Sequence, residues 1–339
     1  MKIKIYQPKH IFELGKRKNQ EDFIWPMAGE ASKNDRLFVV CDGMGGHEAG
    51  EVASEAVATA IGKWSKQHVE EDGIVTTDDM EQAVDYAYQV LDGKDPDGIS
   101  DMGTTLTAIA FHRGGCIATH MGDSRIYHIS KPERKILYKS RDHSLVHDLW
   151  AMGEISYEEM ATHPRRNVIT KAMQSGPERH CEATIVHIAH LEEDDYLYLC
   201  SDGMLEQMSD QEIVDILCGP GSDDEKIEML TQATVDNSDN HSAYLIHIAD
   251  VEHEDGDDAH EDDEAAMSDP VELSDESQDE KEEVPIEEKN EITDQEAEAE
   301  TADEPKKRGR TWKWLLVLLL LVLAAVAGAI VKTLYFNQQ

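Results

Sequence analysis

The sequence predicts an α+β fold for residues 1–250, followed by an acidic disordered linker and one transmembrane helix. Two observations carry this division. Over residues 1–250, segments with strand and helix character come in blocks, which favours an α+β sandwich over a parallel βαβ fold. From residue 251 onward the composition changes, first to mainly acidic residues and then to an apolar run.

The predicted elements of residues 1–250 follow from hydrophobic periodicity and turn signals. Residues 37–43 form a short apolar run ending in Asp-Gly, which predicts a buried strand that opens into a loop. Residues 104–129 predict three strands, with Gly114-Gly115 turning the first pair and Gly122-Asp123 the second. The predicted helices are residues 48–64, 80–91, 144–152, 213–218 and 226–235, and the further predicted strands are residues 184–188, 196–201 and 243–248.

The net charge of -40 is concentrated in the linker, residues 251–305. Residues 251–304 contain 26 acidic residues and two lysines, with almost no periodic apolar character. Such a segment cannot bury enough surface to fold, and it repels itself into an extended chain. It is either a solvated spacer or an interaction tail for a basic partner or for residues 144–175. The strongly acidic chain also excludes nucleic acid as a partner, because it repels phosphate.

Residues 314–331 predict a transmembrane helix. They are 18 consecutive uncharged residues, mostly Leu, Val and Ala, and a helix of this length spans about 27 Å, close to the thickness of a hydrocarbon core. Five basic residues lie in residues 306–313, whereas only Lys332 follows the span. The positive-inside rule therefore places the folded domain in the cytoplasm and residues 332–339 outside the cell (inner) membrane. No amino-terminal signal peptide is visible.

The five cysteines predict reduced, buried thiols. Their number is odd, and none of them forms a CxxC pair, so the spacing of a zinc site or a disulfide framework is missing. Three of the five lie in apolar, strand-like runs, where a thiol acts as a small apolar side chain. The cysteines are Cys41, Cys116, Cys181, Cys200 and Cys218.

Acidic residues recur where apolar runs end and loops leave a sheet. Carboxylates at strand ends supply the oxygen ligands that magnesium and manganese prefer, and an adjacent glycine lets a backbone carbonyl approach the ion. Any one Asp-Gly pair is better explained as a plain turn, because Asp-Gly is the commonest turn dipeptide, so the joint occurrence carries the prediction. The clusters are Glu21-Asp22, Asp42-Gly43, Asp123, Asp202-Gly203 and Asp239-Asn240.

In this order, the clusters lie in stretches that resemble the metal-dependent protein phosphatase 2C family in its bacterial form. The resemblance covers nearly all of residues 10–250 and implies a β-sandwich of two antiparallel sheets flanked by helices. Ser242 stands where the family usually has threonine, which keeps a hydroxyl, and Glu21 precedes Asp22 as in eukaryotic members. The matching stretches are RKNQED (17–22), VVCDGMGGHEAGEVAS (39–54), GTTLTA (103–108), GDSRIY (122–127), RDHSLV (141–146), HPRRNVITKAM (163–173), LCSDGM (199–204) and SDNHSA (238–243).

The resemblance implies two manganese or magnesium ions bridged by Asp42. Asp202 and Asp239 would complete the shell of one ion, and Asp123 would hold a third, weaker ion. A water that bridges two cations loses much of its proton affinity and becomes a nucleophile near neutral pH. No cysteine nucleophile in the loop of a tyrosine phosphatase is present, which favours direct attack by water on phosphorus.

The resemblance places the second ion on Glu21 or Asp22 together with the carbonyl of Gly43. It also implies that Arg17 binds the substrate phosphate. The planar guanidinium can meet two phosphate oxygens at once, which an ammonium group cannot do.

Two further regions are candidates for catalysis and substrate contact. His47, in a glycine-rich loop, is either the general acid that protonates the leaving group or a surface residue or cap of the following helix. Residues 144–175 resemble the family's flap beside the active site. In this segment Arg165 and Arg166 either contact a phosphopeptide or form a solvated basic face.

Together these features predict an enzyme that hydrolyses phosphoserine and phosphothreonine on proteins and opposes a serine/threonine kinase. The expected partners are phosphorylated proteins, a cognate kinase and the membrane. Two alternatives stay open at this point. One is a membrane-tethered, non-catalytic module that binds phosphoproteins, and the other is a metallophosphatase acting on small phosphate esters.

Overall fold

The computed structural model describes residues 2–45, 49–69, 73–96 and 101–252, which all lie within one compact unit, Met1–Asp263. His47, the linker from residue 253 onward and the predicted membrane helix at residues 314–331 lie outside the described residues. Within the described ranges, no helix is both long and apolar enough to cross a membrane.

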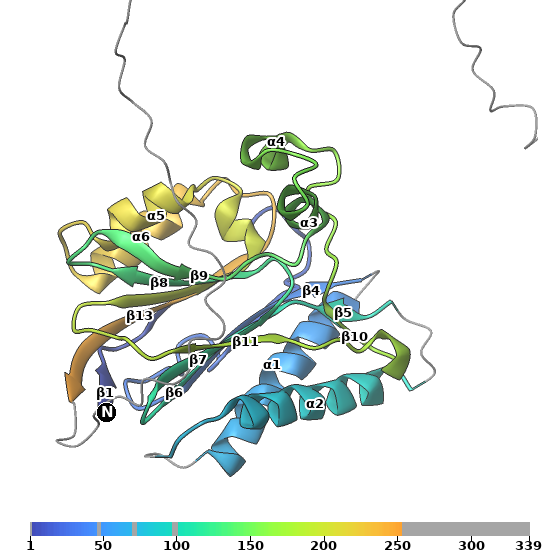
Figure 1. Cartoon of the computed structure of the whole chain (residues 1–339), viewed down its shortest axis with the longest axis horizontal. Helices are drawn as coiled ribbons and strands as arrows, with labels where there is room; N and C mark the ends of the chain where they lie inside the picture. Colours follow the sequence, from blue (N-terminus) through green and yellow to red (C-terminus); the bar gives the residue numbers. More distant parts are fainter. Residues whose placement is uncertain (1, 46–48, 70–72, 97–100, 253–339) are drawn as a thin grey trace, which may run out of the picture. The chain divides into compact units, whose positions relative to one another are not determined.

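The core is a sandwich of two β-sheets in which neighbouring strands are antiparallel (Figure 1). The six-stranded sheet has the order β1 (Lys2–Ile5), β13 (His241–Glu252), β12 (Tyr196–Cys200), β8 (Arg125–Ser130) and β9 (Lys135–Lys139), with β2 (Lys9–Glu13) also paired to β13. The seven-stranded sheet has the order β10 (Met173–Gln174), β5 (Gly103–Thr104), β4 (Leu37–Met44), β6 (Leu106–His112), β7 (Gly115–Met121) and β11 (Thr184–Ile188), with β3 (Asp22–Trp25) also paired to β4.

Helices cover the outer face of each sheet, as the resemblance implied. α1 (Ala49–His68) and α2 (Thr77–Lys94) pack on the seven-stranded sheet, and α5 (Asp210–Leu217) and α6 (Asp223–Ala233) on the six-stranded sheet (Figure 1). The segment between β9 and β10 carries α3 (Leu145–Ala151) and α4 (Tyr157–Thr162) at one end of the sandwich. Two short 3₁₀ helices complete the described elements, η1 (Pro177–Arg179) and η2 (Asp202–Leu205).

The continuous apolar run of β4 is explained by burial on both of its faces. Leu37, Val39 and Cys41 point toward α1 and α2, whereas Phe38 and Val40 point into the space between the two sheets. A strand covered on both sides needs apolar residues at every position instead of an alternating pattern. The strand predicted at residues 37–43 is thereby confirmed.

The prediction that the cysteines are buried is confirmed for four of the five. All five cysteines are free, and four of them are buried. Cys41, Cys116 and Cys200 lie in β4, β7 and β12, where they fill core positions.

Three predicted helices begin one turn earlier than their apolar pattern indicated. α2, α5 and α6 start at residues 77, 210 and 223, three residues before the predicted starts. Their first turns are acidic, and the caps Thr76, Ser209 and Ser222 each form a reciprocal capping box. Capping and the helix dipole stabilise these first turns without any apolar residue, so periodicity alone missed them.

The predicted second hairpin of residues 104–129 is wrong. β6 and β7 do pair, with His112 opposite Gly115, so Arg113-Gly114 forms the turn. β8, however, belongs to the other sheet, where it pairs with β12 and β9. Gly122, with φ of 105°, therefore begins a crossover between the two sheets. A Gly-Asp pair between two strands signals a change of chain direction, but it does not say which sheet receives the next strand.

Candidate functional site

Asp22 and Asp42 lie directly opposite each other on β3 and β4. Asp22 is buried, and the hydroxyl of Ser201, at the end of β12 in the other sheet, donates to its Oδ2 at 2.8 Å. Its Oδ1 is buried without a hydrogen-bond partner among the described residues. This carboxylate therefore joins the two sheets and keeps one oxygen available to a ligand.

The backbone of Asp42 is fixed by two threonines. Its N–H donates to Thr105 Oγ1 at 2.9 Å, and its carbonyl accepts from Thr105 N at 2.8 Å and from Thr104 Oγ1 at 2.9 Å. Thr105 Oγ1 is also 2.7 Å from Ser124 Oγ, beside Asp123. Because its backbone is held in this way, the carboxylate of Asp42 has a defined position at the end of the sheet.

Asp202 and Asp239 come from the six-stranded sheet. Asp202 follows β12 and begins η2, and Asp239 lies two residues before β13. The two loops touch through backbone atoms, because a Cβ on Gly203 would lie 1.9 Å from the carbonyl oxygen of Asn240. Only glycine allows this approach. Arg17, in the loop between β2 and β3, donates from Nη2 to Asp239 Oδ2.

The pKa shifts of these carboxylates reflect burial and their mutual electrostatic influence. Burial raises the pKa of Asp22 to about 7, assisted by the charges of Asp202 and Asp239. Burial also raises the pKa of Asp42 well above its usual range, and the charges of Asp22, Asp202 and Asp123 add to the effect. The pKa of Asp123 rises to about 7 from burial and from Asp202. Desolvation raises the pKa of Asp202 as well, although this residue keeps accessible surface.

Glu21 and Gly43 occupy the same end of the sandwich. Burial raises the pKa of Glu21, while the guanidinium of Arg17 opposes this shift. Gly43 donates its N–H to the Glu21 carbonyl at 2.9 Å, and a Cβ on Gly43 would lie 2.1 Å from the carbonyl oxygen of Gly50 in α1. Asp22 is thus the deeper of the two acids and faces Asp42, whereas Glu21 lies with Arg17 and Asp239.

The donor set fits a hard divalent cation. Carboxylates from both sheets supply oxygen ligands, and the free, buried Oδ1 of Asp22 needs a positive partner once the group is ionised. Among the described residues, however, no group of three or more His, Cys, Asp or Glu side chains is already drawn together as a metal site. The fit therefore rests on the chemistry of the donors and on their mutual electrostatic effect.

A cavity of about 1170 Å³ adjoins this cluster. Asp123, Asp202 and Asp239 line it on one side, and Tyr157 and Arg166 of the α3–α4 segment line it elsewhere. Arg165 is exposed and is not among the lining residues. Of the two arginines predicted to contact substrate, the structure thus brings Arg166 to the site and leaves Arg165 outside the cavity.

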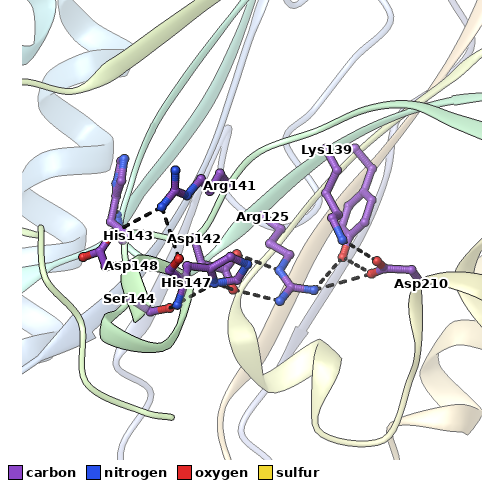
Figure 2. A network of polar contacts seen from close by, with 11 residues as sticks. Arg125, Lys139, Arg141, Asp142, His143, Ser144, His147, Asp148 and Asp210 are labelled. Carbon is purple, nitrogen blue, oxygen red and sulfur yellow. Dashed lines mark hydrogen bonds and ion pairs between the residues drawn. The ribbon is translucent and has the colours of Figure 1, made fainter. Parts of the chain in front are cut away.

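A polar network connects this cavity to α3 and α5 (Figure 2). Arg125 donates from Nε and Nη2 to the two oxygens of Asp142, each at 2.8 Å, and its Nη1 is 3.4 Å from Asp210 Oδ1. Lys139 Nζ donates to Asp210 Oδ2 at 2.6 Å, and His147 Nδ1 lies 3.6 Å from Asp142 Oδ2. Because Arg125, Asp142 and His147 all line the cavity, this network fixes one of its walls.

Comparison with known proteins decides the family. A model of the family described as Protein phosphatase 2C matches residues 18–219. The chain belongs to the protein phosphatase 2C family. As a protein phosphatase it is an enzyme that removes phosphate from proteins, and the two-sheet sandwich is the fold of this family.

Named relatives of this phosphatase are bacterial. The serine/threonine phosphatase stp of Listeria welshimeri is 33% identical over 232 residues, covering 64% of this chain and 86% of that protein. The crystal structure of the Mycobacterium tuberculosis serine/threonine phosphatase PstP/Ppp has a TM-score of 0.62 at 28% identity, covering 73% of this chain and 100% of that one. A structure of the catalytic domain of PstP in complex with two manganese ions has a TM-score of 0.60, with the same identity and coverage.

Several residues that shape the phosphatase site were not singled out from the sequence. Thr105, Ser201 and Arg125 all lie in the family-like stretches, so their presence in a motif was the available signal. None of them carries a charge pattern that predicts a ligand, and their partners are distant in the chain. Their roles became visible only through the contacts that the fold creates.

Proposed function

We propose that this phosphatase hydrolyses phosphoserine and phosphothreonine in proteins by direct attack of water, with divalent metal ions bound at the aspartate cluster. The observation that carries the proposal is the convergence of Asp22, Asp42, Asp123, Asp202 and Asp239, from both sheets, beside one large cavity. The manganese-containing PstP structure supports the choice of metal.

In the proposed site, Asp42, Asp202 and Asp239 would hold one manganese or magnesium ion, and Asp42 would also be a ligand of a second. Asp123 would hold a third ion. When bound, two divalent cations would lower the pKa of a water molecule and so make it a nucleophile. The role of the chain is to hold the carboxylates in place, as the two threonine contacts to the Asp42 backbone do.

The second ion would be held by Glu21 or Asp22 together with the Gly43 carbonyl. Asp22 is supported by its free buried oxygen and its position opposite Asp42. Glu21 is supported by its position near Arg17 and Asp239. Both acids stay in the proposal.

Arg17 is the proposed phosphate-binding group. Its contact with Asp239 uses Nη2, and the side chain is 52% exposed, so other N–H groups stay available. A guanidinium can donate two parallel hydrogen bonds to a phosphate and thereby orient phosphorus for in-line attack. The chain would thus bind the dianion beside the carboxylates that hold the metal ions.

The size of the cavity favours protein substrates over small phosphate esters. Pockets for drug-sized ligands measure about 300–1000 Å³, and the cavity here, at about 1170 Å³, exceeds that range. Arg166 lines it and would attract acidic groups of a phosphopeptide. A serine/threonine kinase that phosphorylates the same substrates is the expected opposing partner.

His47 is the proposed general acid for the leaving alkoxide. In the sequence it follows Asp42 by five residues in a glycine-rich stretch, and it lies outside the described residues. A serine or threonine alkoxide is a poor leaving group and needs a proton, whereas a nitrophenolate needs none.

One assay on the full chain tests these proposals. With manganese, we expect hydrolysis of a phosphothreonine peptide that outcompetes p-nitrophenyl phosphate, and we expect a chelator to abolish it. Arg166→Ala should raise KM for the peptide only, with Arg165→Ala as the matched control, and His47→Ala should slow the peptide more than the nitrophenyl ester. If peptide hydrolysis is undiminished in chelator, the proposed metal-dependent mechanism is wrong.

We also propose that residues 314–331 anchor the phosphatase in the cell membrane, with the catalytic domain in the cytoplasm. The uncharged run and the basic residues at 306–313 support this arrangement. We expect the full chain to sediment with membranes after alkaline carbonate washing and a chain ending at Glu252 to stay in the supernatant. The same pair, assayed with a peptide, distinguishes a passive spacer at residues 251–305 from a tail that alters activity.

A further inference from the structure

We propose that Asn240 is the positioning residue for the loop of residues 14–21, and that it thereby sets where Arg17 and Glu21 stand in the site. The part that concerns substrate rests on the proposed function of Arg17 as the phosphate-binding group. The part that concerns the loop rests on the hydrogen bonds of the Asn240 side chain alone.

The side-chain amide of Asn240 forms hydrogen bonds across the whole loop. Its Nδ2 donates to the Leu14 carbonyl at 2.9 Å and to the Asn19 carbonyl at 3.0 Å. Its Oδ1 accepts from the Glu21 N–H at 2.8 Å. Arg17 lies between these fixed points, so one buried side chain holds the loop on both sides of the guanidinium-bearing residue.

Only an amide suits this position. Two donors and one acceptor are needed, and asparagine supplies both kinds of group on a short side chain. Aspartate offers acceptors only and would face two carbonyl oxygens, while leucine has neither kind of group. Asn240 is 3% exposed, so water does not readily replace these bonds.

The neighbouring backbone holds the same loop from a second side. Gly15 has φ of 60°, and a Cβ there would lie 2.1 Å from the Asp239 carbonyl oxygen. Arg17 in turn contacts the Asp239 carboxylate. The Asp239-Asn240 pair therefore combines two roles, because Asp239 is a proposed metal ligand and Asn240 fixes the loop that brings Arg17 to that carboxylate.

Asn240→Leu in the full chain tests the loop directly. In hydrogen-exchange mass spectrometry, we expect faster exchange of the amides of residues 14–21 than in the unmodified chain. The matched control is Asp195→Asn, which changes a buried polar side chain, bonded to His128, at the opposite end of β12 from Asp202. It should lower the melting temperature without changing exchange in residues 14–21.

Kinetics test the consequence for substrate. With manganese and a phosphothreonine peptide, Asn240→Leu should raise KM about tenfold, as expected for losing a net hydrogen-bond contribution to Arg17 placement, with a smaller effect on kcat. In an Arg17→Ala background the same change should add little to KM, because coupled residues are not additive.

The outcomes separate the two levels of the proposal. Unchanged exchange in residues 14–21, or fully additive effects of Asn240→Leu and Arg17→Ala on KM, would overturn the positioning role. If the unmodified chain does not hydrolyse the peptide, the proposed function is wrong. The hydrogen-exchange measurement would then test the positioning role of Asn240 by itself. If Asn240→Leu does not fold, the same measurements are made on Asn240→Asp, which keeps the hydrogen bond from the Glu21 N–H.

Discussion

Asp42→Asn is expected to lower kcat/KM for a phosphopeptide by on the order of a thousandfold or more, because preorganised charge at a reacting centre contributes the largest single effect in many enzymes. Asp42 faces Asp22 across two paired strands, and its pKa is raised by burial and, in addition, by three neighbouring carboxyl groups. An amide of the same shape keeps the backbone contacts to Thr105 but removes the charge that two cations would share. The measurement is peptide hydrolysis in manganese, with circular dichroism as a check of folding.

The matched control is Asp250→Asn in β13. Asp250 pairs with Lys4 near the surface, at 46% exposure of its side chain. Exposed ion pairs contribute about 0–1 kcal/mol, so activity should be unchanged. Activity of Asp42→Asn within tenfold of the unmodified enzyme would contradict the assignment of this residue to the metal ions.

The second large effect concerns stability of the metal-free protein, which we expect to fall as the pH rises from 6.5 to 8. Asp22 and Asp123 have folded pKa values of about 7, far above those of unfolded aspartate. In this window the folded state binds protons that the unfolded state has already lost. Stability then falls as the pH rises through the folded pKa of about 7 and levels off above it. The slope for a buried group such as Asp22 is up to about 1.4 kcal/mol per pH unit while the folded carboxyl is still protonated, and it is smaller toward pH 8.

The window is chosen because histidines act in the opposite direction at lower pH. Desolvation lowers the pKa of His112 and His143 to about 4 and that of His120 to about 3. Between pH 4 and 6.5 these groups bind protons mainly in the unfolded state, so their contribution to stability rises with pH. At pH 6.5 unfolded histidine, with a pKa of about 6.5, still holds part of its charge, and its opposing contribution fades as the pH rises toward 8.

Thermal unfolding in chelator and in manganese measures this effect. The midpoint in chelator should fall between pH 6.5 and 8, and manganese should raise it more at pH 8 than at pH 6.5, because the ion binds ionised carboxylates. Asp22→Asn should flatten the slope in chelator. A midpoint in chelator that stays constant over this window would show that the carboxylates do not repel one another as inferred.

Much of the fold followed from local patterns. The apolar run that became β4, the strand at residues 184–188 and the capped helix after Ser144 are each set by burial and capping within a few residues. The crossover at Gly122-Asp123 was missed because strand pairing is a long-range property, and the same two residues suit a hairpin or a change of sheet.

The sequence by itself determined which functional groups are available, namely carboxylates that can bind metal ions and guanidinium groups that can bind phosphate. The chemical nature of these groups does not depend on where the fold places them. The sequence also set the strongly acidic charge and the resemblance to a phosphatase family. Only the tertiary structure decided that Asp22 is the deeper acid, that Arg166 and not Arg165 lines the cavity, and that Asn240 holds the loop of Arg17. These depend on contacts between residues far apart in the chain, such as Leu14 and Asn240, which are 226 positions apart. Packing of two sheets creates such contacts where no local pattern records them.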